Sequence, residues 1–166
     1  MVKILGLGMH PFADTFITKD QLSESEPVYP HECFLDETTG EIKLGIETNP
    51  SDRYNLYDYS YTSSNSKFSR DHWNSYAIDV EKNLNLPDNC KVLEIGSNDG
   101  YLCEQFLHMG YEVCGVDPSK HMCDLAKKRG IIVYETLFSE FSAPIIEQDS
   151  DIMQRVAILN FVDFAK

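Results

Sequence analysis

The chain has 166 residues, of which 42% are hydrophobic, and its formal net charge is -13 with a pI near 4.6. This length allows one ordinary domain or two small ones. The negative charge argues against nucleic-acid binding, which relies on Lys and Arg to neutralise phosphates.

Targeting signals and cysteine usage narrow the class of protein further. The amino-terminal residues lack the apolar segment of a signal peptide, and no stretch is long and apolar enough for a membrane helix, so we expect a cytoplasmic protein. Five cysteines without a C-x-x-C pair argue against a disulfide framework and a zinc knuckle. We expect them to be buried free thiols: Cys33, Cys90, Cys103, Cys114 and Cys123.

The first 50 residues are rich in turn formers, and their middle predicts a β-hairpin. PVYPHECFL (27–35) and EIKLGIE (41–47) are candidate strands on either side of DETTG (36–40), which suits a tight turn. A tyrosine-rich loop follows over 51–70. Its tyrosines either pack the amino-terminal unit against its neighbour or form a lid that faces a substrate.

A helical pattern begins at Ser69, which we expect to be the N-cap. The apolar stripe is Trp73, Tyr76, Ala77, Val80 and Leu84. Residues 86–89 then end the helix.

From residue 91 onward strand and helix patterns alternate, which predicts an open parallel sheet of the α/β class. Strands are expected at 91–95, 111–117, 131–135 and 155–162, and helices at 101–110, 119–130 and 138–148. Ligands of such sheets bind at the carboxyl ends of the strands, so the loop GSNDG (96–100) should lie in the binding crevice.

Two cofactor classes use a glycine turn after the first strand, and their charges separate them. The carboxylates of Glu94 and Asp99 would repel a pyrophosphate. In addition, Asn98 occupies the second glycine position of a dinucleotide-binding loop. S-adenosylmethionine carries a sulfonium and an ammonium, which nearby acids favour. Asp117, at the end of the second strand, could accept a ribose diol or simply help to begin the next helix.

LGMHPFADTFI, YDYSYTSS, VLEIGSNDGYL and GVDPS resemble sequences of the sugar C-methyltransferases, with similarity over about residues 5–140. These enzymes methylate a carbon of nucleotide-linked deoxysugars and join a zinc-binding amino-terminal domain to a Rossmann-like S-adenosylmethionine domain. The resemblance implies two domains here, 1–68 and 69–166. It implies cofactor contacts by Glu94, Gly96, Ser97, Asn98, Gly100, Asp117 and Pro118, and sugar contacts by Tyr59 and Tyr61.

The amino-terminal half departs from the family at its metal ligands. Of two cysteine pairs in the family, one would precede Met1, and the other aligns with Asp36 and Thr39. We therefore expect no zinc, since a tetrahedral site needs its full set of ligands. The spacing of His10, His31 and Cys33 matches no standard site.

The carboxyl-terminal segment departs too, because Val156, Ala157 and Phe161 stand where the family has a polar cluster. Beyond Lys166 the family continues with further strands, a catalytic Glu-His pair and a nucleotide-sugar domain. The resemblance thus implies a truncated chain with a partial Rossmann-like sheet of about four parallel strands. Its open edge would favour a homodimer or a partner chain that covers it.

The function expected from the resemblance is methyl transfer from S-adenosylmethionine to a sugar carbon. A general base is needed for that reaction, and the weak candidates are Tyr59, Tyr61 and His72, of which His72 fits a surface histidine better. The alternative is a catalytically incomplete binding or interaction module that keeps the cofactor fold. A dinucleotide-binding protein is the third possibility. Among basic side chains, Lys127, Lys128 and Arg129 could form a patch toward an anionic acceptor.

Overall fold

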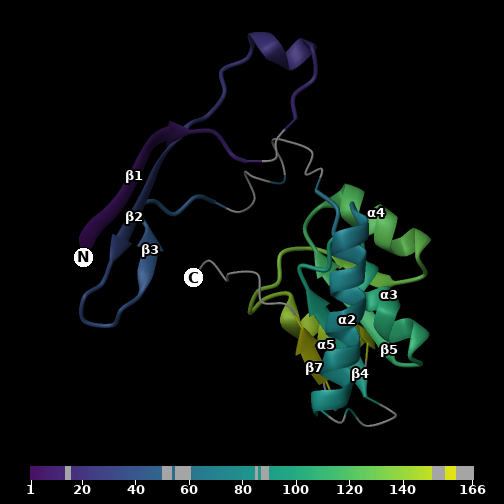
Figure 1. The fold of residues 1–166 in the computed structure, drawn as a ribbon. Coiled ribbons are helices and arrows are strands. Elements are labelled where there is room, and N and C mark those ends of the chain that lie inside the picture. Colours follow the sequence, from purple (N-terminus) through teal and green to yellow (C-terminus); the bar gives the residue numbers. More distant parts are fainter. Residues whose placement is uncertain are drawn as a thin grey trace. The chain divides into compact units, whose positions relative to one another are not determined.

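The computed structural model describes residues 1–13, 16–49, 54, 61–84, 86, 90–150 and 156–159. They form two compact units, which divide between residues 60 and 61 (Figure 1). The predicted boundary at residue 68 lies later. Residues 61–68 belong to the second unit, where Tyr61, Ser63 and Ser64 bond to Asn98 and Asp99. The expected helix-ending residues 87–89 lie outside the described residues.

The amino-terminal unit is an antiparallel sheet of three strands in the order β1-β2-β3: β1 (Val2–His10), β2 (Tyr29–Leu35) and β3 (Ile42–Leu44). A short 3₁₀ helix, η1 (Asp20–Ser23), lies between β1 and β2. The predicted hairpin of β2 and β3 is confirmed, with Gly40 at φ 76° in its turn. Strand β1 was not predicted, because its two glycines weaken the strand pattern. No residue described in this unit is buried.

The second unit contains a parallel sheet in the order β6-β5-β4-β7: β4 (Lys91–Ile95), β5 (Glu112–Asp117), β6 (Ile132–Glu135) and β7 (Val156–Leu159). The predicted α/β fold with four parallel strands is therefore confirmed. Its helices are α2 (Lys67–Leu84), α3 (Tyr101–His108), α4 (Lys120–Lys128) and α5 (Ala143–Ser150). None of the described helices is both long and apolar enough to cross a membrane.

The core lies on both faces of this sheet, because neighbouring residues of β4 point to opposite sides. Val92 packs with Phe106 of α3 and Ala77 of α2, whereas Leu93 packs with Ile146 of α5. Such two-sided burial explains why β4 has an almost continuous apolar sequence. Four of the five cysteines are buried and all five are free, with Cys33 only partly covered.

Helix α2 begins earlier than its pattern predicted. The Ser66 hydroxyl accepts a hydrogen bond from the Ser69 backbone N–H at 3.0 Å, so Ser66 caps the helix and the predicted cap at Ser69 is wrong. The apolar stripe is largely confirmed, since Ala77 is buried and Trp73, Tyr76 and Val80 pack around it. Leu84 is 58% exposed in the last turn.

Helix α5 begins later than the predicted residue 138. Ser139 and Ser142 exchange hydrogen bonds between their hydroxyls and backbone N–H groups, at 2.8 and 3.3 Å. Serine side chains that bond to nearby backbone favour a turn over a helix interior. The predicted fourth strand is confirmed over residues 156–159.

Phe106 is the largest fully buried side chain, and it contacts Tyr111 edge-on with ring centres 6.2 Å apart. Replacing it in the variant Phe106→Ala should lower the free energy of unfolding by about 3–5 kcal/mol through lost burial and a cavity. Urea unfolding followed by fluorescence of Trp73, the single tryptophan, reports on this cluster. Leu107→Ala is the control, because Leu107 is 38% exposed. Equal losses in both variants would contradict the assigned core.

Candidate functional site

The candidate site lies where β4 ends, between β5 and β7 in the sheet. The strand order reverses at β4, and in open α/β sheets the ligand crevice forms outside the carboxyl ends at such a point. Residues 96–100, here called the glycine loop, connect β4 to α3 at this position. The sequence prediction that this loop lies at the crevice agrees with the topology.

The glycine loop is tightly folded, with three residues at positive φ. Gly96, Asn98 and Gly100 have φ values of 74°, 51° and 73°, a conformation that glycine and asparagine tolerate best. The backbone N–H of Gly96 donates to the carbonyl of Val116 in β5 at 2.8 Å. The loop is therefore pinned to the end of the neighbouring strand.

Asp117, the last residue of β5, is only 6% exposed, and its carboxylate holds two parts of the site together. One oxygen accepts the backbone N–H of Asn98 at 2.9 Å, and the other accepts that of Ser119 at 2.8 Å. Burial raises the pKa of Asp117, while these two hydrogen bonds act in the opposite direction.

Asp117 therefore does support the turn that leads into α4, as one of the two expectations had it. Ser119 caps that helix by accepting from the Met122 N–H at 3.4 Å. A carboxylate offers about four lone-pair positions, and the two backbone bonds use about two of them. The remaining positions are enough for a diol, so the structural role does not preclude the ligand role.

Glu94 is 4% exposed near the end of β4, beside the buried thiol of Cys103 in α3. Burial, and then the charge and hydrogen bonding of Glu94, raise the pKa of Cys103 well above its usual value. Cys103 therefore stays protonated and inert, as expected of a structural thiol. The carboxylate adds negative charge to the floor of the site.

Two buried side-chain oxygens of the glycine loop make no hydrogen bond within the structure: Ser97 Oγ and Asp99 Oδ1. Unsatisfied buried acceptors are costly, which is why they commonly mark a site completed by a ligand. Together with Glu94 and Asp117 they form an acceptor-rich, negatively charged set. This set fits the sulfonium, ammonium and ribose hydroxyls of S-adenosylmethionine and does not fit a pyrophosphate.

The side chain of Asn98 turns away from a ligand role and toward residues that precede α2. Its amide donates to the Tyr61 carbonyl at 2.9 Å, and its oxygen accepts the Ser63 N–H at 2.8 Å. The predicted contact by Asn98 could thus come only from its backbone. Gly96 and Pro118 are partly exposed, whereas Gly100 is buried against Ala126 of α4.

Arg129 was grouped by sequence with Lys127 and Lys128 as a surface patch, but the structure separates it from them. Its guanidinium forms ion pairs with Asp99 at 3.2 Å and Glu104 at 2.8 Å, whereas both lysines are exposed. Ser64, which also contacts this group at 2.9 Å, carried no sequence signal. Pairing between residues 65 positions apart is invisible to local periodicity.

Neither Tyr61 nor His72, the two candidate general bases among the described residues, contributes a side-chain hydrogen bond to this site. Tyr61 is 44% exposed and takes part through its backbone carbonyl. His72 is exposed on α2, with its ring 4.9 Å from that of Trp73. Tyr59 lies outside the described residues, as does Phe161 of the carboxyl-terminal segment.

Asp36 and Thr39, which were aligned with metal ligands of the sugar C-methyltransferases on resemblance alone, lie in a hairpin turn. Asp36 accepts the Thr38 N–H at 2.9 Å, and Thr39 accepts the Glu41 N–H at 3.3 Å. The first of these bonds is the main reason why the pKa of Asp36 is lowered. Among the described residues, no group of three His, Cys, Asp or Glu side chains could hold a metal ion.

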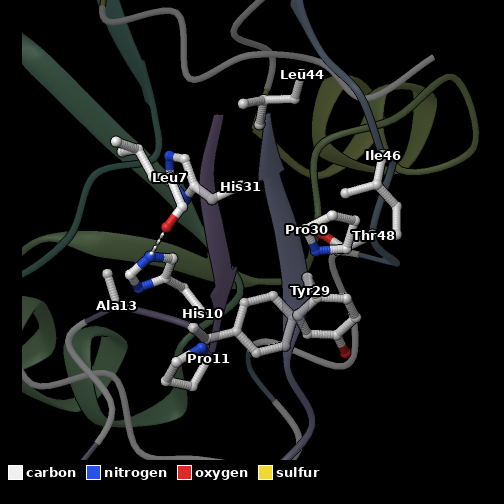
Figure 2. A pocket seen from close by; sticks show the side chains of 11 residues that line it. Leu7, His10, Pro11, Ala13, Tyr29, Pro30, His31, Leu44, Ile46 and Thr48 are labelled. Carbon is white, nitrogen blue, oxygen red and sulfur yellow. Dashed lines mark hydrogen bonds between the residues drawn. The ribbon is translucent and has the colours of Figure 1, made fainter. Parts of the chain in front are cut away.

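A separate concavity of about 480 Å³ lies on the amino-terminal unit (Figure 2). His10 and His31 line it with ring centres 5.8 Å apart, alongside Tyr29, Pro30 and Leu44. Figure 2 shows the His10 ring bonded to the Leu7 carbonyl, at 2.8 Å. None of the predicted cofactor contacts belongs to this concavity.

Comparison with known proteins identifies the region around the glycine loop. Residues 93–152 match the model of the methyltransferase domain family. An uncharacterized methyltransferase of Oceanobacillus iheyensis is 32% identical over 99 residues, which cover 57% of this chain and 45% of that protein. C-methyltransferase NovU of Streptomyces niveus is 24% identical over 145 residues, 87% of this chain and 33% of that protein.

Among solved structures, a SAM-dependent methyltransferase from Archaeoglobus fulgidus has 22% identity and a TM-score of 0.32, over 39% of this chain and 29% of that one. The chain spans less than half the length of the two curated relatives. Residues 93–152 are thus similar to a methyltransferase domain, and S-adenosylmethionine is the cofactor that this match implies. The cofactor expected from the sequence, S-adenosylmethionine, is confirmed by this match to the domain family.

Replacing Gly100 by alanine tests how closely the glycine loop must approach α4, and replacing Gly110 is the control. A Cβ at this position would lie 2.9 Å from Ala126 Cβ, whereas a Cβ at Gly110, also left-handed at φ 93°, would meet nothing within 4 Å. Both Gly→Ala variants should lose about 1–2 kcal/mol of stability from backbone strain. Gly100→Ala should lose roughly 1–3 kcal/mol more from overpacking. Urea unfolding followed by Trp73 fluorescence measures the free energy of unfolding of both variants. Equal losses in the two would argue against a close contact between the loop and α4.

Proposed function

We propose that this chain is an S-adenosylmethionine-dependent methyltransferase whose acceptor is a carbon of a nucleotide-linked sugar. The observation that carries the cofactor half is the buried acidic set around the glycine loop, with Ser97 Oγ and Asp99 Oδ1 left as acceptors for a ligand. The partial match to C-methyltransferase NovU and the motif YDYSYTSS favour the sugar acceptor.

Each residue of the site has a role that follows from its chemistry. Asp117 would accept the ribose hydroxyls, and Glu94 would attract the positively charged methionine end. Gly96 and Ser97 would let the backbone approach the ligand closely, with Asn98 and Pro118 fixing the curvature of that surface. Gly100 would serve the same loop indirectly, by letting it pack closely on α4. When bound, S-adenosylmethionine supplies a methyl group on a sulfonium, which is already a good leaving group. The chain's own share is therefore mainly orientation and exclusion of water.

Carbon methylation also requires a proton acceptor beside the sugar. Tyr59 and Tyr61 remain the proposed sugar contacts, and His72 is a poor base because it is exposed and packs on Trp73. The second candidate function is consequently a binding module that holds the cofactor without transferring its methyl group.

Binding is tested by calorimetric titration of S-adenosylhomocysteine, the stable product, into the wild type and the variants Asp117→Asn and Asp124→Asn. Asp117→Asn should weaken binding by roughly tenfold or more, because a hydrogen bond to a charged group contributes about 1.5–3 kcal/mol. Asp124→Asn removes the same charge from the surface pair with Lys120 and should bind like the wild type. Equal affinity of all three would overturn the proposed site.

The raised pKa of Asp117 gives this binding a characteristic pH dependence. A protonated carboxyl loses acceptor capacity, so affinity should fall as the pH drops through the pKa of Asp117. The decline should begin above the pH at which an exposed aspartate protonates. Asp117→Asn should lack this decline, and an identical profile in the variant would assign the titration to another group.

Catalysis is tested by incubation with isotopically labelled S-adenosylmethionine and a nucleotide-linked deoxysugar, followed by mass spectrometry and NMR of the product. A labelled methyl on a ring carbon supports the proposed reaction. A labelled methyl on oxygen would refute carbon methylation, and tight cofactor binding without any transfer would favour the binding module.

A further inference from the structure

Arg129, at the carboxyl-terminal end of α4, is bonded on three sides of its guanidinium. Nε donates to the Asp99 carbonyl at 2.9 Å, Nη1 donates to Glu104 at 2.8 Å, and Nη2 donates to Ser64 Oγ at 2.9 Å and to Asp99 Oδ2 at 3.2 Å. The group also lies 5.3 Å from the ring centre of Tyr101. Only arginine has the rigid fork of donors that can join so many acceptors at once.

One of these partners lies in the segment 61–66, here called the strap, which leads into α2. Ser64 Oγ donates to Asp99 Oδ2 as well as accepting from Arg129, so it bridges the two charged groups. The strap is also held by Asn98, whose side chain bonds to the Tyr61 carbonyl and the Ser63 N–H. The strap thus has two anchors, and both are consecutive residues of the glycine loop.

The two anchors, Asn98 and Asp99, are also part of the proposed cofactor site. The backbone N–H of Asn98 donates to Asp117, and the Asn98 side chain is the group that fastens the strap. The backbone carbonyl of Asp99 is held by Arg129, while Asp99 Oδ1 is buried without a partner. A displacement of the strap would therefore change the loop that supports the ligand.

Because Asp99 is buried, removing only its partner Arg129 would lower the stability of this network strongly. The side chain of Asp99 is 2% exposed and that of Arg129 is 27% exposed. Removing the arginine would leave a buried carboxylate with its principal positive partner missing, which is far more destabilising than loss of a surface pair. The most direct relief is for Asp99 to turn toward water, and that movement would reshape the glycine loop.

We propose that Arg129 is a positioning residue that holds the strap and the glycine loop in one arrangement, so that cofactor binding and closure of the strap favour each other. This inference rests on the proposed function, because it assumes that the cofactor occupies the glycine loop. Linkage requires the effect to be reciprocal: a strap that is fastened raises cofactor affinity, and bound cofactor protects the strap.

The test measures two quantities in the full chain: affinity for S-adenosylhomocysteine by calorimetry, and hydrogen exchange of the backbone amides of residues 61–66. The variants are Arg129→Ala, Arg129→Lys and Ser64→Ala. Lys82→Ala is the control, because Lys82 is an exposed basic residue in the last turn of α2. Trp73 fluorescence verifies that each variant is folded.

Arg129→Ala should bind roughly tenfold more weakly, which is within the range typical of coupled sites. It should also exchange the strap amides faster and lose the protection that ligand gives them in the wild type. Arg129→Lys should recover part of the affinity, since it restores the charge without the fork. Ser64→Ala spares both ion pairs and should show the same two changes to a smaller degree. Lys82→Ala should match the wild type.

Two results would overturn the inference. One is wild-type affinity in folded Arg129→Ala. The other is faster exchange of the strap amides in Arg129→Ala while bound ligand still protects them as much as in the wild type. If Arg129→Ala fails to fold, Ser64→Ala decides alone, and wild-type behaviour there refutes the coupling. Failure of the proposed function is distinguishable, because the wild type itself would then not bind S-adenosylhomocysteine.

Discussion

The two backbone hydrogen bonds that the buried carboxylate of Asp117 accepts hold the site together. One bond reaches the glycine loop after β4 and the other reaches the first turn of α4, so a single side chain fixes two chain segments around the ends of neighbouring strands. The carboxylate keeps acceptor capacity beyond these bonds. Under the proposed function the same carboxylate would serve both folding and ligand binding, and the glycine loop depends on it for its shape.

The surroundings of Asp117 explain why a positively charged ligand suits this crevice. Glu94 and Asp99 are both buried within a few residues of each other, and Arg129 forms an ion pair with Asp99. Asp117 keeps acceptor capacity beyond its two backbone bonds, and it does so in a poorly solvated place. A cofactor with a sulfonium and an ammonium relieves that imbalance, whereas a pyrophosphate would increase it.

Local patterns in the sequence were sufficient for the parallel sheet but not for the contacts around it. The apolar runs of β4, β5 and β6 and the glycines that follow α3 and α4 predicted those elements closely, because both signals act within a few residues. Strand β1 was missed since its glycines conceal its pairing with β2. Arg129 was assigned to the surface because its ion pairs with Asp99 and Glu104 join residues distant in sequence. The role of Asn98 in fastening the strap was hidden for the same reason.

Mapping the binding of S-adenosylhomocysteine by two-dimensional ¹H–¹⁵N NMR would test the central claim most directly, namely that the cofactor binds at the ends of β4 and β5. The account predicts that titration shifts the backbone amides of residues 94–100 and 117–119 most strongly and leaves those around His10 and His31 unchanged. Shifts concentrated at the His10 concavity, or no shifts at saturating ligand in a folded chain, would contradict it.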